Sequence, residues 1–249
     1  MMPFSPKPLT NSFLRPHGLS KEHKILLGGI ELIPDLSGAL YVPDYETLII
    51  SDLHLEQGSS LARRGAHVPP FDTAVTLALL ETVVSAAQPK RLIFLGDSFH
   101  DGEGETRLEE SHLKNLRALT QNHDTIWIIG NHDPQPPQNL GGQGAESLAL
   151  GPLTLRHEPT RRLDSQLEIA GHLHPGCGIN QRGRRIYGKC FVSDDTRLIM
   201  PAFGAYTGGL SITSKAFHGL LNTETAQAHM IGRAALHRFS LVRLTGSPR

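Results

Sequence analysis

Short apolar segments of this sequence end in side chains that are able to bind metal ions. The stretch IIGNHDP, residues 128–134, begins as a segment suited to a buried strand and ends in Asn, His and Asp. A tight turn needs Asn or Asp, but it has no need of the His between them. The residue types therefore indicate a chemical role at this strand end.

Four other apolar segments end in the same way. They are LIISDLH, LIFLGDSFHD, LTLRH and LEIAGHLH, at residues 48–54, 92–101, 153–157 and 167–174. In open α/β sheets ligands bind at the carboxyl ends of strands, because the loops there converge on one crevice. The oxygen and imidazole donors of the five segments are Asp52, His54, Asp97, Asn131, His157, His172 and His174. Such a mixture of donors suits divalent transition metals.

Seven ligands are more than one ion needs, and they divide naturally between two ions. Paired ions of this kind lie roughly 3.5–4 Å apart and share a bridging ligand. We expect Asp97 to be the bridge. Each piece alone has a simpler interpretation, since an isolated Asp or Asn after a strand is usually a turn former and an isolated HxH is usually a solvated pair. Five strand ends in one chain favour the metal site.

The elements that would position these donors alternate between strands and helices. Apolar runs bounded by Gly, Pro, Asp and Ser predict strands within 25–35, 38–43, 46–52, 90–97, 124–131 and 165–171. Apolar positions at helical spacing predict helices over 71–87 and 107–120. Residues 184–192 and 196–203 look like a hairpin. The pattern predicts an α/β layered fold with mixed sheets.

Composition limits the class of protein. The 249 residues carry 24 basic and 24 acidic side chains, so non-specific binding to nucleic acid through an overall positive charge is not expected. Residues 1–24, rich in Pro and polar side chains, are expected to form a flexible arm, and 25–249 a single domain. Two cysteines and no apolar signal or membrane segment predict a cytoplasmic protein without a membrane partner.

The ordered set DxH, GD, GNHD, lone His and GHxH, spanning residues 51–174, resembles the calcineurin-like metallophosphoesterase superfamily. The resemblance implies a calcineurin-like layered sandwich of mixed β-sheets flanked by helices. It also implies a division of the ligands, with one ion held by Asp52, His54, Asp97 and His174 and the other by Asp97, Asn131, His157 and His172. His132 is implied to face the substrate rather than a metal.

A narrower resemblance is to the ligase-associated DNA damage response endonucleases. The segments that carry it are SDLHLEQGSSLARRG, LGDSFHD, IIGNHDP, LRHEP, GHLHP and PAFGAYTGG, within residues 25–215. That family implies Mn²⁺-dependent cleavage of DNA phosphodiesters in bacterial repair, beside an ATP-dependent DNA ligase, a helicase and an exonuclease. The donor types themselves also admit Fe, Zn or Mg.

Catalytic and substrate-binding residues are less sharply indicated. His132 is suited to protonate a leaving oxygen, and such a His needs an orienting group. Asp101 is the candidate, although this chain is one residue longer than the superfamily's GDxxD and a loop Asp before Gly102 is an equal interpretation. Arg63 and Arg64 follow the first ligand segment and are candidate phosphate contacts, or else solvated loop residues.

Three functions follow from these features. The first is a two-metal DNA endonuclease or phosphodiesterase. The second keeps the metal site but acts on a small nucleotide or a phosphoprotein. The third is a non-catalytic scaffold for repair proteins, which the complete set of ligand types in the sequence argues against.

Overall fold

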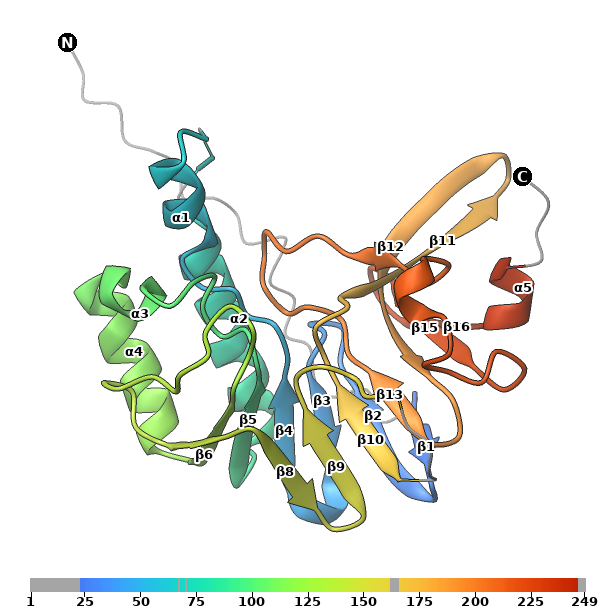
Figure 1. Cartoon of the computed structure of the whole chain (residues 1–249), viewed down its shortest axis with the longest axis horizontal. Coiled ribbons are helices and arrows are strands. Elements are labelled where there is room, and N and C mark those ends of the chain that lie inside the picture. The colour runs from blue at the N-terminus through green and yellow to red at the C-terminus, as the bar shows by residue number, and fades with distance from the viewer. Residues whose placement is uncertain (1–22, 67, 70, 162–165, 246–249) are drawn as a thin grey trace.

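The computed structural model describes residues 23–66, 68–69, 71–161 and 166–245. The predicted arm at 1–24 therefore lies almost wholly outside the described residues. Within them the chain forms two β-sheets packed face to face, with helices on the outer face of the first sheet (Figure 1). The α/β class with mixed sheets, predicted from the sequence, is confirmed.

The first sheet has seven strands in the order of the chain. They are β1 (Ile25–Leu27), β2 (Ile30–Pro34), β3 (Leu40–Val42), β4 (Thr47–Ile50), β5 (Arg91–Leu95), β6 (Asp124–Ile128) and β7 (Gln143–Ala145). The strands from β1 to β4 pair antiparallel as a meander, and those from β4 to β7 pair parallel. The carboxyl ends of β4, β5 and β6 consequently share one edge of the sheet.

The second sheet joins the later segments of the chain. Its order is β14 (Leu210–Ser211), β11 (Pro175–Gln181), β12 (Arg184–Ser193), β13 (Arg197–Ile199), β10 (Leu167–Ala170), β9 (Leu153–Arg156) and β8 (Ser147–Leu150). Strand β10 runs parallel to β9 and β13, and β12 also pairs with β15 (Gln227–Ile231), which pairs with β16 (Leu236–Ser240). The predicted hairpin is present as β12 and β13, paired antiparallel.

Three apolar clusters hold the layers together. One fills the space between the sheets, and it includes Leu27, Ile49, Ile93, Leu155 and Phe191. Another lies between the first sheet and two helices, α2 (Asp72–Ala87) and α4 (Glu110–Gln121), where the stacked rings of Phe94 and Trp127 have centroids 4.1 Å apart. The third packs the second sheet on the C-terminal segment, which contains α5 (Leu241–Thr245).

The shorter helices lie in the loops after the strands. Helix α1 (Gln57–Arg63) follows β4, and α3 (Gly104–Arg107) follows β5. Short 3-10 turns occupy Pro43–Tyr45 and Lys215–Phe217. In Figure 1, β4, β9 and β10 point in the same direction, and α1 and the β11–β12 hairpin rise beyond their carboxyl ends.

Candidate metal centre

The seven candidate ligands all follow the carboxyl ends of strands. Asp52 follows β4, Asp97 follows β5, Asn131 follows β6, His157 follows β9, and His172 and His174 follow β10, while His54 lies two residues beyond Asp52. Since β4, β5 and β6 are parallel, and β9 and β10 are parallel in the facing sheet, these ends meet. The convergence expected from the sequence is therefore observed.

The donors divide into two groups. Asp52, His54 and His174 form one group, and Asp97, His157 and His172 form the other, with the donor atoms of each group within 4.8 Å of one another. In the first, His174 Nε2 lies 3.1 Å from Asp52 Oδ1. In the second, His157 Nε2 lies 3.2 Å from His172 Nδ1.

Asp97 lies between the two groups. Its Oδ2 atom is 3.3 Å from His157 Nε2 and 3.8 Å from His54 Nε2. One carboxylate oxygen therefore faces an imidazole of each group, as a bridging ligand must. Asn131 completes the second group, because its Oδ1 atom lies 3.0 Å from His157 Nε2.

The backbone at these ligands is strained. Nine non-glycine residues of the described chain have positive φ angles, and five of them are candidate ligands: Asp52 (54°), His54 (45°), Asp97 (45°), His172 (67°) and His174 (44°). A left-handed conformation is costly for an L-residue and persists only where surrounding contacts enforce it. Bonds between loops supply that enforcement. The His54 amide donates to the Asp97 carbonyl at 2.9 Å, and the His172 amide donates to the Asp52 carboxylate at 3.1 Å.

Gly96 allows the second group to approach the first sheet. Its φ angle is 78°, and a methyl group at this position would lie 2.2 Å from Nδ1 of His157. No side chain fits there. The glycine of the GD segment is therefore required by the close passage of a ligand from the facing sheet.

The electrostatics of the second group favour a proton on His157. Burial lowers the pKa of this imidazole, but the hydrogen bond with Asp97 and the charges of Asp52 and Asp97 outweigh burial and raise the pKa to about 9. Burial likewise raises the pKa of Asp97, and the His157 contact overcomes this effect and lowers it to about 2. His157 Nδ1 lies 3.1 Å from the Leu95 carbonyl and donates to it, which leaves Nε2 facing the other donors.

The pKa of His54 is shifted in the opposite direction to that of His157. Burial of its ring dominates and lowers its pKa to about 4, so the imidazole is neutral at physiological pH. Neutral imidazole is the form that binds metal ions. The first group is therefore ready to accept an ion without losing a proton from His54.

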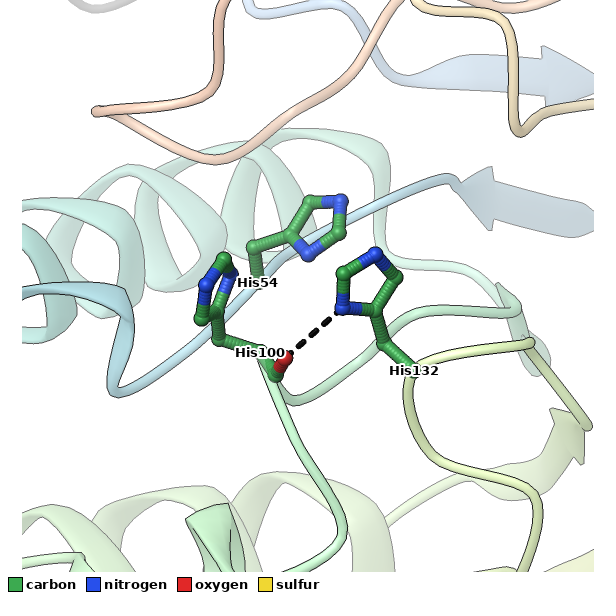
Figure 2. Close-up of side chains that lie close together, drawn as sticks. All are labelled: His54, His100 and His132. Carbon is green, nitrogen blue, oxygen red and sulfur yellow. Dashed lines mark hydrogen bonds between the residues drawn. The ribbon is translucent and has the colours of Figure 1, made fainter. Parts of the chain in front are cut away.

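His132 belongs to neither of these two groups, but with His100 and His54 it forms a third cluster whose donor atoms lie within 4.8 Å of one another. Figure 2 shows its ring next to those of His54 and His100, with centroid distances of 5.1 Å to His54 and 5.3 Å to His100. Its Nδ1 atom is 2.8 Å from the carbonyl oxygen of His100, which accepts this hydrogen bond. The side chain is exposed, so Nε2 is accessible to a substrate.

The expected contact between Asp101 and His132 is not the one that forms, which corrects the sequence-based assignment. The two carboxylate oxygens of Asp101 accept from Arg107 Nη1 and Nη2 at 2.8 and 2.9 Å. Burial raises the pKa of Asp101, but the Arg107 contact outweighs it and lowers the pKa to about 2. A backbone carbonyl orients His132 instead, and Asp101 holds the loop that carries this carbonyl.

Arg63 and Arg64 lie at the end of α1, on the rim of this region. Arg63 is exposed and pairs with Glu103 at 2.8 Å. Arg64 is exposed, and its charge contributes to a lowered pKa of His100, for which burial is the main cause.

Three residues around the site carried no clear sequence signal. Asp133, 7% exposed, accepts from the Ser98 amide at 2.8 Å, and burial raises its pKa to about 7. Ser51 donates to Oδ2 of Asp52. Lys189 donates to the carbonyls of Ala202 and Gly204 at 2.8 and 2.9 Å, and burial lowers its pKa to about 8. Asp133 lies within the GNHD segment, which was its only sequence signal, whereas nothing in the sequence near Lys189 indicates its role.

The donor set fits two divalent ions. Each group offers carboxylate oxygen and imidazole nitrogen, the second adds an amide oxygen, and one carboxylate faces both. Divalent transition metals bind such mixtures. The sequence profile of the calcineurin-like phosphoesterases matches residues 45–199, which include every donor described above.

The chain belongs to the calcineurin-like phosphoesterase family. The phosphoesterase is also similar to a solved nuclease, MPE from Pseudomonas putida, with 27% sequence identity and a TM-score of 0.70. That match covers 86% of the phosphoesterase chain and 99% of the nuclease chain. Together with the paired donor groups, these similarities show that the chain is a metal-dependent phosphoesterase.

Other solved structures are less similar to this phosphoesterase. YfcE, a phosphoesterase from E. coli, has 15% identity and a TM-score of 0.39, with 78% of this chain and 98% of that chain covered. AQ665 from Aquifex aeolicus, a protein of unknown function, has 19% identity and a TM-score of 0.37, with 55% and 81% covered. A comparison with curated protein sequences finds no match. No helix of the described residues is long and apolar enough to span a membrane.

Proposed function

We propose that this phosphoesterase is a Mn²⁺-dependent DNA endonuclease acting in bacterial DNA repair. The observation that carries the proposal is the pair of donor groups bridged by Asp97, in a chain similar over its length to a bacterial nuclease. The resemblance to ligase-associated endonucleases supports the repair context. An ATP-dependent DNA ligase, a helicase and an exonuclease are the proposed partners. The two buried free cysteines, Cys177 and Cys190, suit the reducing cytoplasm that we propose as its location.

The proposed ligand assignment follows the two groups. Asp52, His54, Asp97 and His174 would hold one ion, and Asp97, Asn131, His157 and His172 the other. Two bound ions acidify a water molecule and neutralise charge on the phosphate oxygens. Mn²⁺ is proposed over Fe, Zn or Mg on the family resemblance, because the donor types admit all four.

His132 is the proposed general acid. Its Nδ1–H is held by the His100 carbonyl, so Nε2–H of the protonated ring remains available to a substrate. A phosphodiester that presents its leaving oxygen there receives that proton as the P–O bond breaks. General acid catalysis of this kind typically contributes about 10²–10⁴-fold to the rate.

The proposal is tested on DNA without ends. Circular single-stranded and circular duplex DNA are incubated with Mn²⁺ and the wild type, Asn131→Ala or His132→Ala, and bound metal is measured on each sample. We expect the wild type to cut circles and both variants to lose most activity. His132→Ala should keep its metal, whereas Asn131→Ala should lose part of it.

Two results would contradict the proposal in different ways. If circles resist cleavage but linear DNA is degraded, the enzyme is an exonuclease. If no DNA is cut but a small phosphodiester is hydrolysed in an Asn131-dependent and His132-dependent manner, the metal mechanism stands and the substrate is a small ester or phosphoprotein.

A further inference from the structure

The β11–β12 hairpin begins at the metal centre and extends away from it. Pro175, the first residue of β11, directly follows His174. Six cross-strand pairs run from Gly176–Lys189 to Gln181–Arg184, a length of roughly 17 Å at about 3.3 Å per residue. The outer half of the hairpin is exposed and rises beyond the strand ends (Figure 1).

The tip of the hairpin carries positive charge without a carboxylate partner. Arg182, Arg184 and Arg185 are exposed, and none of them pairs with an acidic side chain of the described residues. Other arginines of the described chain do have acidic partners, as Arg91 has Asp124 and Arg107 has Asp101. The unpaired charge makes the hairpin attractive to a polyanion.

Tyr187 and Arg185 lie on one face of this hairpin, where their side chains pass over Gly176 and Gly178 of the neighbouring strand. A methyl group at Gly176 would lie 2.4 Å from Tyr187 Oη, and one at Gly178 would lie 3.2 Å from Arg185 Nε. The glycines therefore let the tyrosine ring rest against the backbone, while 48% of the residue remains exposed. Arg184 and Ile186 point to the opposite face, because strand side chains alternate.

The tyrosine is close to the metal centre. Its hydroxyl donates to the Gly209 carbonyl at 3.3 Å, and the adjacent Leu210 amide donates to the His174 carbonyl at 3.0 Å. The tyrosine ring is therefore anchored by Gly209, in a segment that is hydrogen-bonded to the candidate ligand His174. Arg185 lies two residues, roughly 7 Å, further along the strand, which is about one nucleotide of an extended chain.

We propose that the β11–β12 hairpin is a binding arm for single-stranded DNA, in which Tyr187 stacks on a base beside the metal centre and Arg185 binds the next phosphate. The inference rests on the proposed nuclease function and assigns the substrate strand a place on this hairpin. Aromatic stacking with a charged backbone contact is how proteins hold single strands without reading sequence. Duplex bases already stack on their neighbours, so the exposed tyrosine face selects an unpaired base.

The alternation of the strand provides matched controls. Tyr187→Ala and Arg185→Ala alter the proposed binding face, and Ile186→Ala and Arg184→Ala alter the opposite face of the same hairpin. Each is made in a His132→Ala background, so that a labelled oligothymidylate survives in Mn²⁺, and binding is followed by fluorescence anisotropy over a range of salt concentrations. Thermal unfolding verifies that each variant is folded.

We expect Tyr187→Ala to weaken binding roughly tenfold and Tyr187→Trp to restore it, because stacking needs only an aromatic face. Arg185→Ala should lower the slope of log affinity against log salt by about 0.7, the loss of one phosphate contact on a single strand. The two control variants should bind as the parent does. With His132 intact, all four alanine variants should hydrolyse bis(4-nitrophenyl) phosphate at the parental rate, since this small ester does not reach the arm.

The outcomes separate the arm from the nuclease function. If the parent binds and the intact enzyme cuts single strands, but Tyr187→Ala and Arg185→Ala behave like the controls, the arm is refuted and the nuclease proposal stands. Equal weakening on a blunt duplex would refute stacking on an unpaired base. If the intact enzyme hydrolyses the small ester while DNA is neither bound nor cut, the nuclease proposal fails and the arm fails with it.

Discussion

The proton on His157 makes metal binding to the second group dependent on pH. Without an ion, the contact with Asp97 and the charges of the two nearby carboxylates outweigh burial and hold the imidazole pKa at about 9. The side chain is 5% exposed, so water screens these charges poorly. A metal ion binds the neutral ring, and its arrival must release this proton.

The size of the effect follows from the distance between the pKa and the working pH. At pH 7, roughly one ring in a hundred is neutral when the pKa is about 9, which weakens apparent affinity about 100-fold, or ~2.7 kcal/mol. Apparent affinity should therefore rise about tenfold for each pH unit from 6.5 toward 9 and then level off. His54 and His172 add no such slope there, because burial lowers the pKa of each.

Isothermal titration of metal-free protein with Mn²⁺ measures this linkage. Titrations at pH 6.5, 7.5 and 8.5, each in two buffers of different ionisation enthalpy, give the affinity and the number of protons released. We expect one proton released for the second ion at pH 7.5, and no such proton in His157→Asn. Affinity independent of pH, with no proton released by the wild type, would refute the assignment of a charged His157.

Three other substitutions test the framework of the site. Gly96→Ala should abolish binding of the second ion while leaving the first measurable by metal analysis, because the added methyl group collides with His157. Lys189→Met should lower the free energy of unfolding by about 1–3 kcal/mol in a urea titration, since two loop carbonyls lose their donor. Asp133 binds its proton more tightly when folded, so its own contribution to the stability of the metal-free protein should fall as pH rises from about 4 through 7. His54 contributes with the opposite sign over most of this range, because burial lowers its pKa to about 4. The free energy of unfolding of Asp133→Asn should therefore rise more steeply with pH than that of the wild type between pH 4 and 7; parallel pH profiles would refute the raised pKa of Asp133.

The strand ends were predictable because local chemistry specifies them. An apolar run followed by a metal-type side chain needs no distant information, and the helix expected over 71–87 is observed at Asp72–Ala87. The division of donors into two groups agrees with the family resemblance. These features depend on residue type and spacing, which the sequence contains directly.

Other features depend on partners far apart in the chain. Strand β11, PGCGINQ, has no apolar run of its own and forms through its six pairs with β12. The orienting group of His132 is a backbone carbonyl, and residue type does not encode which carbonyl will be near. Lys189 donates to backbone carbonyls of the loop after β13, and no residue type in that loop indicates this contact. Sequence patterns therefore identify the side chains that perform chemistry more readily than they identify the contacts that hold those side chains in place.

The left-handed backbone at five candidate ligands places function and stability in opposition. A left-handed L-residue costs roughly 1–2 kcal/mol, so the five together approach the whole net stability of an ordinary domain. Replacing His54 or His174 by glycine would relieve part of that cost while deleting a ligand. Substitutions that stabilise the chain at these positions would therefore remove metal ligands. In a variant engineered for stability, these ligand positions should be the ones that cannot be changed without loss of function.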